Sequence, residues 1–377
     1  MQYRKFGKTA ENLSILGFGA MRLPTIGDDN SQIDYDKAIK MVRYSIDNGV
    51  NYLDTAYPYH GGKSEAFCAA AMKDGYREKV NIATKCPTWA IEKHEDFYSK
   101  LEEQMGNLEV DQIDFYLIHA LGHDLWAKAT KSNYKAFLDD AKKQGKIRYA
   151  GFSFHDDLDL FKEIVDDYDW DFCQIQLNYM DEEFQAGIEG MEYAHKKGLG
   201  VIIMEPLRGG LLAREELPEE VKNLFNSYDS KRTPAEWALK YLWDKKEVGL
   251  LLSGMSTLEQ VKQNINTASD ATVGCLSAQE HEIINKVRDF YISRTAINCT
   301  DCKYCMPCPA GVNIPGNFRA YNHEAMYDDH QRAHELIHMW MDEGERASNC
   351  VQCGQCEEKC PQNIEIMKNL AIIAEKY

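Results

Sequence analysis

Eight of the twelve cysteines lie after residue 298, in two closely spaced groups. The first group is Cys299, Cys302, Cys305 and Cys308, and the second is Cys350, Cys353, Cys356 and Cys360. Thiolates at Cys-x-x-Cys spacing bind zinc or iron–sulfur clusters, and groups this regular in a chain without signs of secretion indicate metal rather than disulfides. We therefore expect residues 299–377 to form a metal-binding segment.

The spacing within the groups favours two [4Fe-4S] clusters. In the second group, two, two and three residues separate the cysteines and Pro361 follows, which resembles the bacterial ferredoxin run. The first group is one residue shorter before its last cysteine but also ends in Cys-Pro. In two-cluster ferredoxins the fourth cysteine of each run serves the other cluster, so the resemblance assigns Cys360 to the first group's cluster and Cys308 to the second's. Zinc held by four cysteines is the alternative.

The segment between the two cysteine groups is helical in composition from Asn317 to Gly344, and the region resembles the helical dicluster ferredoxins. It contains His334-Glu335-Leu336-Ile337-His338, which fits the His-Glu-x-x-His pattern of zinc proteases. His330 extends the same stripe. Because a linker between two cluster groups leaves no protease fold around it, we interpret these histidines as a solvated helix face.

Four polar residues in the first third of the chain form a second candidate site. They are Asp54, Tyr59, Lys85 and His119. Reducing a carbonyl with hydride puts negative charge on oxygen, so the site needs a proton donor and a group that stabilises the charge. Singly, these residues have ordinary roles as a helix cap, loop packing, a strand-end charge and a buried histidine. Their placement at or just after successive apolar runs favours catalysis instead.

Short apolar runs alternate with helical patterns up to residue 255, which predicts an α/β fold built as a (β/α)₈ TIM barrel. The expected strands are 14–19, 51–54, 80–85, 113–119, 149–154, 172–177, 200–204 and 248–253. The expected helices are 36–48, 64–72, 95–106, 134–145, 158–168, 184–197, 233–243, 258–268 and 277–291, with Gly49, Gly106, Gly145 and Gly198 as C-terminal caps. Active sites of such barrels lie at the carboxyl ends of the strands, where the four polar residues fall. We expect the barrel to span residues 1–298, followed by a small, mainly helical ferredoxin-like domain.

The segments Asn51 to Tyr59, Ala83 to Lys85 and Tyr116 to His119, together with Glu65, resemble the signatures of the aldo-keto reductase family over residues 1 to 290. The resemblance implies a catalytic tetrad of the four polar residues. In it, the phenol of Tyr59 donates the proton and the ammonium of Lys85 favours its ionised form. Asp54 holds the lysine, and His119 orients the substrate carbonyl.

The same resemblance implies a nicotinamide cofactor, either NADP or NAD. The residues expected to contact it are Gly19, Ala20, Met21, Arg22, Asp54, Ser153, Gln174, Met204, Glu205, Pro206, Leu207, Arg208, Gly209, Gly254, Met255, Gln260 and Asn264. Phe154 and Met204 depart from the family pattern, which often has Asn and an aromatic residue there. Basic side chains that usually hold the 2′-phosphate of NADP are also missing, so NAD is the alternative cofactor.

Composition and charge restrict the partners. The formal charge of −17 disfavours nucleic acid and anionic membranes, and no apolar run has the length of a membrane span or signal peptide, so we expect a cytoplasmic enzyme. The partners implied are a small carbonyl or alcohol substrate and a redox partner protein. Hydride chemistry moves two electrons and clusters move one, so a flavin or an external partner would have to connect them. The alternative is an electron-transfer or redox-sensing protein whose barrel only binds a nicotinamide or flavin.

Overall fold

The computed structural model describes residues 1–27, 29–229, 231–299, 305–360 and 362–377, which divide into two compact units. The first unit comprises Met1–Glu215 and Lys231–His281, and the second comprises Glu216–Ser230 and Glu282–Tyr377. The boundary expected near residue 298 lies inside the second unit. None of the helices in the described part of the chain is long and apolar enough to cross a membrane.

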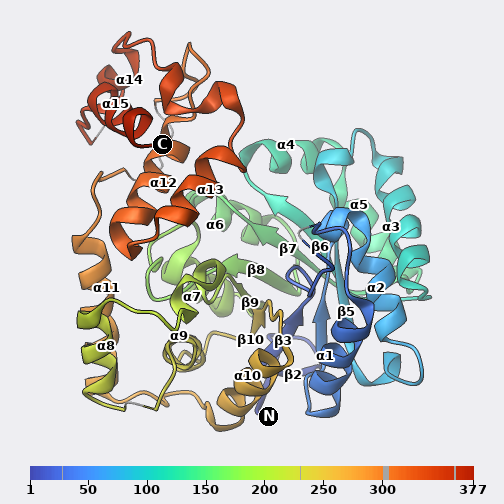
Figure 1. Ribbon diagram of the computed structural model, residues 1–377. Coiled ribbons are helices and arrows are strands. Elements are labelled where there is room, and N and C mark those ends of the chain that lie inside the picture. The colour runs from blue at the N-terminus through green and yellow to red at the C-terminus, as the bar shows by residue number, and fades with distance from the viewer. Residues whose placement is uncertain (28, 230, 300–304, 361) are drawn as a thin grey trace. The chain divides into compact units, whose positions relative to one another are not determined.

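Eight of the described strands of the first unit form a closed barrel of parallel strands in sequential order (Figure 1). They are β3 (Leu16–Gly19), β4 (Tyr52–Asp54), β5 (Asn81–Cys86), β6 (Ile113–Leu121), β7 (Ile147–Phe154), β8 (Phe172–Gln176), β9 (Gly200–Met204) and β10 (Leu250–Ser253). Each predicted run overlaps one of them, and β5, β6 and β7 extend one or two residues beyond the predicted ranges. Parallel strands covered on both faces are apolar throughout, which is why these runs lack a polar–apolar alternation. The predicted (β/α)₈ barrel is confirmed.

Helices surround the barrel strands and follow the predicted segments closely. They are α1 (Tyr35–Asp47), α2 (Ser64–Ala71), α3 (His94–Leu108), α5 (Tyr134–Lys143), α6 (Leu158–Asp167), α7 (Gly187–Lys196), α9 (Pro234–Trp243) and α10 (Leu258–Asp270). The predicted helix 277–291 corresponds to α11 (Ala278–Ser293), most of which belongs to the second unit. One further helix, α4 (His123–Lys131), has no predicted counterpart. The cap positions Gly49, Gly145 and Gly198 have the expected positive φ.

Two helix boundaries differ from the prediction. Helix α3 does not end at Gly106, because the buried Leu108 extends it and Glu109 takes the left-handed cap conformation with φ 53°. Helix α7 begins at Gly187 rather than at residue 184, since Gln185, in the turn before the helix, and Gly187, its first residue, both have positive φ. The helical period of the sequence alone could not predict either boundary, because one depends on the packing of Leu108 and the other on the turn before α7.

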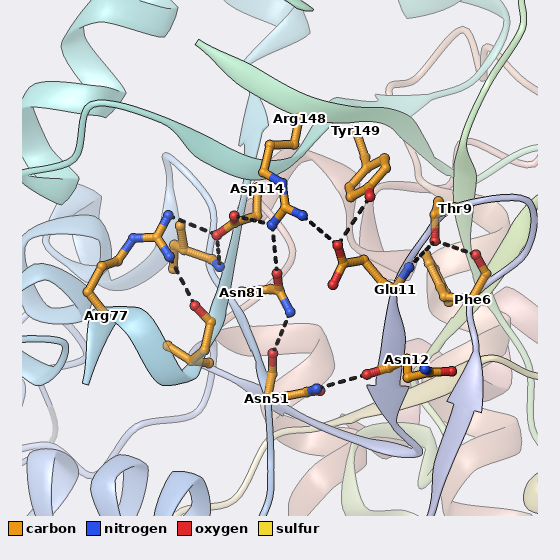
Figure 2. Close-up of polar contacts among 12 residues, drawn as sticks. Phe6, Thr9, Glu11, Asn12, Asn51, Arg77, Asn81, Asp114, Arg148 and Tyr149 are labelled. Atoms are coloured by element: carbon orange, nitrogen blue, oxygen red, sulfur yellow. Dashed lines mark hydrogen bonds and ion pairs between the residues drawn. The ribbon is translucent and has the colours of Figure 1, made fainter. Parts of the chain in front are cut away.

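A hairpin of β1 (Tyr3–Lys5) and β2 (Asn12–Ser14) covers the amino-terminal end of the barrel. Between its strands, Phe6 is fully buried among the barrel residues and contacts the rings of Phe115 and Phe172. A polar network surrounds it, in which Arg148 bridges Glu11 at 2.5 Å and Asp114 at 2.9 Å (Figure 2). This end of the barrel is therefore closed, and the opposite end is left for chemistry.

The second unit is mainly helical. It contains α8 (Glu219–Asn226), α12 (Ile314–Tyr327), α13 (His330–His338), α14 (Gln355–Glu358) and α15 (Ile366–Lys376). Helices α12 and α13 confirm the helical segment predicted between the cysteine groups. An apolar cluster that includes Phe318, Ile337 and Leu370 forms its core.

The network at the barrel's closed end yields a stability prediction. Arg148→Met should lower the free energy of unfolding by about 2 kcal/mol, because it removes charge-assisted hydrogen bonds to the nearly buried Asp114 and to Glu11. Urea denaturation measures the loss. Lys73→Met breaks a pair with Glu109 that is more than half exposed, and should cost less than about 1 kcal/mol. Equal losses in the two variants would contradict this account of the network.

Candidate active site and cysteine groups

The four polar residues predicted to be catalytic come together at the carboxyl end of the barrel. Asp54 is the last residue of β4, Lys85 lies one residue before the end of β5, and His119 lies near the end of β6. Tyr59 begins a short 3₁₀ turn, η1 (Tyr59–Gly62), after β4. Parallel pairing of neighbouring strands places their ends side by side, so residues far apart in sequence converge here.

A buried ion pair forms the base of this site. The Lys85 ammonium donates to the two carboxylate oxygens of Asp54 at 2.8 and 2.7 Å and to the carbonyl of Thr55 at 2.8 Å. The Lys85 side chain is fully buried and that of Asp54 is 4% exposed. Burial raises the pKa of Asp54 despite the nearby ammonium, whereas for Lys85 the attraction of Asp54 and Tyr59 outweighs burial and raises the pKa. The pair therefore holds the lysine as a cation.

Tyr59 lies over this pair. The Lys85 ammonium is 5.0 Å from the centre of the phenol ring, and the ring meets that of His119 edge-on at 6.5 Å between centroids. Burial raises the pKa of Tyr59, and Lys85 acts in the opposite direction with a smaller effect. The expected influence of the lysine is thus present, but the net pKa is above the ordinary value because the phenol is largely desolvated.

A bulge near the end of β6 sets the position of His119. The register with β7 shifts between Ile118 and Leu121, and Ala120 has φ 57°. The ring packs against Trp89 at 5.3 Å between centroids, and Nδ1 of His119 is buried without a hydrogen-bond partner among the described residues. Burial, followed by the charges of Lys85 and His155, lowers the pKa of His119 well below its usual range. The imidazole is therefore neutral.

Ser153 and Gln174 lie beside this set on paired positions of β7 and β8. The Ser153 hydroxyl accepts from the backbone N–H of Ala120 at 2.8 Å, and the Gln174 amide donates to the sulfur of Met204 at 3.5 Å. The amide oxygen of Gln174 is buried and has no partner in the described chain. An acceptor and a hydroxyl donor are thus available to an amide ligand.

The loops expected over the cofactor are held by ion pairs. Arg22, in the loop after β3, lies 3.6 Å from the carboxylate of Glu205, which also accepts the backbone N–H of Gly209 at 2.5 Å. Arg208 pairs with Asp181 at 3.2 Å. Gly19 and Ala20 are buried and Met21 is exposed, while Pro206 and Leu207 lead into the turn η4 (Arg208–Ala213). The two arginines are therefore oriented by carboxylates.

The residues after β10 are held by helix α10. The side-chain oxygen of Gln260 accepts the backbone N–H of Ser256 at 2.8 Å and, in a capping box, that of Thr257 at 3.3 Å. Asn264 donates to Ser253 at 2.9 Å. Met255 is buried, and Gly254 leaves space that the Arg22 side chain approaches. The predicted cofactor positions Gly254, Met255 and Gln260 thus carry no cationic side chain.

Two residues near the site were not singled out in the sequence. Trp89 lies in the turn after β5, where its ring packs on that of His119, and His155 directly follows β7. Phe154 is fully buried and packs on Phe161 of α6, so it faces the helix layer. Because side chains alternate between the two faces of a strand, the sequence could have predicted that Phe154 lies on the face of β7 opposite to Ser153.

The described cysteines of the two groups carry no disulfide, and all of them except Cys353 pack against one apolar cluster of the second unit. Cys302 lies outside the described residues. Cys353 is exposed, and the others described are half-buried. Cysteine side chains gathered around a common core fit ligation of clusters.

The histidines of α13 have other partners. His338 bonds to the carbonyl of Tyr377 at 2.9 Å and His330 to Glu324 at 3.3 Å. Among the described residues, the group of three ligand atoms close enough for a metal ion is instead the exposed set His123, Asp156 and Asp157. Without a further feature that indicates a ligand, that set is an ordinary surface hydrogen-bond group.

Comparison with known proteins distinguishes the same two parts of the chain, the barrel with the four polar residues and the segment with the cysteine groups. Residues 15–289 match the model of the aldo/keto reductase family, and residues 298–365 match that of the 4Fe-4S dicluster domain. Among curated proteins, L-galactose dehydrogenase of Arabidopsis thaliana is 26% identical over 72% of this chain and 89% of its own length. The NADH-specific methylglyoxal reductase of Escherichia coli is 24% identical over 69% of this chain and 91% of its own.

Solved structures show the same fold. An aldo-keto reductase from Bacillus halodurans in its holo form has a TM-score of 0.64 and 28% identity, covering 76% of this chain and 96% of its own. An aldo-keto reductase from Klebsiella pneumoniae in complex with NADPH has a TM-score of 0.61 and 21% identity, covering 75% and 93%.

The depressed pKa of His119 gives a prediction for the free protein. Its ring should stay neutral from pH 8 down to about pH 6, below the usual midpoint near 6.5, because burial disfavours the imidazolium. Histidine NMR titration measures this. The exposed His123, whose pKa is raised by its hydrogen bond to Asp157, should titrate above the usual value in the same experiment. A midpoint for His119 at or above that of His123 would contradict the assignment of a neutral ring.

Proposed function

Because the chain belongs to the aldo/keto reductase family and carries a 4Fe-4S dicluster domain, we propose that it is an oxidoreductase that reduces a small carbonyl compound, or oxidises the corresponding alcohol. The nicotinamide would supply or accept the hydride. The observation that carries the proposal is the buried pair of Lys85 and Asp54 directly beside the phenol of Tyr59.

Each member of the tetrad has a defined task in this reaction. As hydride reaches the carbonyl carbon, the Tyr59 hydroxyl gives its proton to the carbonyl oxygen, so that an alcohol results. The Lys85 cation stabilises the phenolate left behind, and Asp54 holds the ammonium in place. The neutral His119 ring donates an N–H hydrogen bond that orients the carbonyl.

The residues present fit a nicotinamide carboxamide. The orphaned oxygen of Gln174 can accept from the carboxamide nitrogen, and the Ser153 hydroxyl can donate to the carboxamide oxygen, since its own oxygen already accepts from Ala120. Buried acceptors without partners are costly, so a ligand that satisfies Gln174 gains that free energy on binding. Arg22 and Arg208, in loops at the strand ends, would lie near the pyrophosphate.

NAD(H) should bind at least comparably to NADP(H). A 2′-phosphate needs charge-assisted partners, but Gly254 and Met255 offer none and Gln260 caps its own helix. The NADH specificity in the name of the Escherichia coli relative agrees with this proposal. Titrations of both reduced cofactors should give similar dissociation constants. A constant for NADPH a hundredfold lower would show that another cation, such as Arg22, reaches the phosphate.

The cysteine groups would hold two clusters that exchange single electrons with a redox partner protein. Cys353 and the neighbouring Val351 are exposed, Val351 to 67%, so one cluster would lie close to the surface. This exposure supports redox-active clusters over buried structural ones, and also favours the second candidate function, an electron-transfer or redox-sensing protein. A flavin is a further candidate for connecting one- and two-electron steps. We also propose that the protein acts in the cytoplasm and that neither nucleic acid nor a membrane is its partner.

Anaerobically purified protein should contain about eight irons and eight acid-labile sulfides per chain, four of each per cluster. Iron and sulfide analysis, with an absorption spectrum before and after dithionite, measures this. Stoichiometric zinc without sulfide would contradict the cluster assignment, and half the iron would mean that only one group is loaded.

Tyr59→Phe tests the proposed reaction. It should lower the rate of aldehyde reduction, assayed on a panel that includes methylglyoxal, by about 10² to 10⁴-fold, because it deletes only the proton donor. Nicotinamide binding and iron content should not change. Near-normal turnover of Tyr59→Phe, together with loss of activity when the clusters are removed, would favour the electron-transfer alternative.

A further inference from the structure

A buried hydrogen-bond network lies behind the catalytic lysine, and the reaction as described does not use it. Its centre is the side chain of Gln104 on α3, which is fully buried. The amide nitrogen of Gln104 lies 2.6 Å from Oε1 of Glu65 on α2 and 3.0 Å from the backbone carbonyl of Lys85 on β5. The network therefore joins two helices to the strand residue that carries the ammonium.

The orientation of this amide is determined by its neighbours. The Glu65 carboxylate and the Lys85 carbonyl can only accept, so the amide nitrogen of Gln104 faces them, and its oxygen accepts from the hydroxyl of Tyr116 on β6 at 2.8 Å. An amide nitrogen has two N–H groups, and here two strong acceptors, the Glu65 carboxylate and the Lys85 carbonyl, match them. Both N–H groups and the amide oxygen of Gln104 thus have partners. A residue that only filled space would need none of them.

The Glu65 carboxylate anchors the network. It is 1% exposed and accepts from Thr84 at 2.7 Å, from Gln104 and from Asn107 at 3.0 Å. Three donors compensate for the burial of its charge. Because the anchored carboxylate takes one N–H of Gln104, the other is directed to the Lys85 carbonyl at 3.0 Å. The Thr84 hydroxyl, which donates to Glu65, lies 3.2 Å from the same nitrogen.

We propose that Gln104 is a positioning residue, which fixes the backbone of Lys85 and so keeps the ammonium in place beside Tyr59. The inference deepens the proposed carbonyl reduction and rests on it. The contact matters because the Lys85 side chain must reach the Asp54 carboxylate and the Thr55 carbonyl at once, and a shift of its backbone would misplace the charge.

The groups around the phenol determine what a misplaced lysine would do. Asp54 and Glu205 act to raise the pKa of Tyr59, while Lys85 opposes them, and the neutral His119 faces the ring from β6. Near the network, burial raises the pKa of Cys68 and of Cys86 to about 12, so neither thiol carries charge at neutral pH. Loss of the lysine contact would therefore raise the pKa of Tyr59 further.

The experiment compares Gln104→Leu, the milder Tyr116→Phe, and Asn107→Ala as a matched control. Asn107 also bonds to Glu65, one helical turn from Gln104, but does not touch Lys85. Two readouts are used on the cluster-loaded protein. One is the Tyr59 phenol midpoint by NMR of ring-labelled tyrosine, assigned with Tyr59→Phe and measured without turnover. The other is the pH dependence of kcat for aldehyde reduction with NADH.

In Gln104→Leu, kcat should fall at least tenfold, and both the Tyr59 midpoint and the alkaline limb of kcat should move to higher pH. Tyr116→Phe should move both in the same direction by less, and Asn107→Ala should move neither. A fall in kcat with an unmoved midpoint in Gln104→Leu and Tyr116→Phe, or an equal shift in Asn107→Ala, would overturn the proposal. If Tyr59→Phe keeps its turnover, the proposed reaction fails instead, whatever the Gln104 variants show.

Discussion

The burial of one lysine constrains the whole carboxyl end of the barrel. A fully buried ammonium is stable only with a compensating charge and hydrogen bonds, and Asp54 and Thr55 supply them from the adjacent strand. Removing one partner of such a pair typically costs about 3 to 5 kcal/mol. The position of the ammonium beside the phenol therefore depends on the pairing of β4 with β5, because this pairing brings Asp54 and Thr55 to Lys85.

Much of this arrangement follows from the sequence. Asp54, Lys85 and His119 end apolar runs, and parallel strands in a barrel bring such ends together, so their convergence could be predicted. The bulge that re-aims His119 could not, because Ala120 is not a residue that favours positive φ. Partners such as Arg22 and Glu205 are far apart in the chain, and only the closed barrel brings them together.

The direction in which the pKa of Tyr59 shifts could not be predicted from the sequence either. The lysine's effect on the phenol follows from residue types alone, whereas the larger effect of burial depends on how tightly the site is packed. A raised pKa in the free protein keeps the phenol protonated, which is the form that a carbonyl reductase needs. The cysteine groups belong to a different compact unit from the tetrad, so the proposed hydride and single-electron transfers can be studied independently.

The most direct test follows the hydride itself. An anaerobic single turnover with NADH deuterated at the transferring C4 position and an aldehyde substrate, monitored at cluster wavelengths, separates the two chemistries. The account predicts deuterium on the carbinol carbon of the product, a primary isotope effect on the step, and no cluster bleaching before the alcohol forms. Loss of the label to solvent, with cluster reduction at the rate of product formation, would contradict hydride transfer at the Asp54, Tyr59, Lys85 and His119 site.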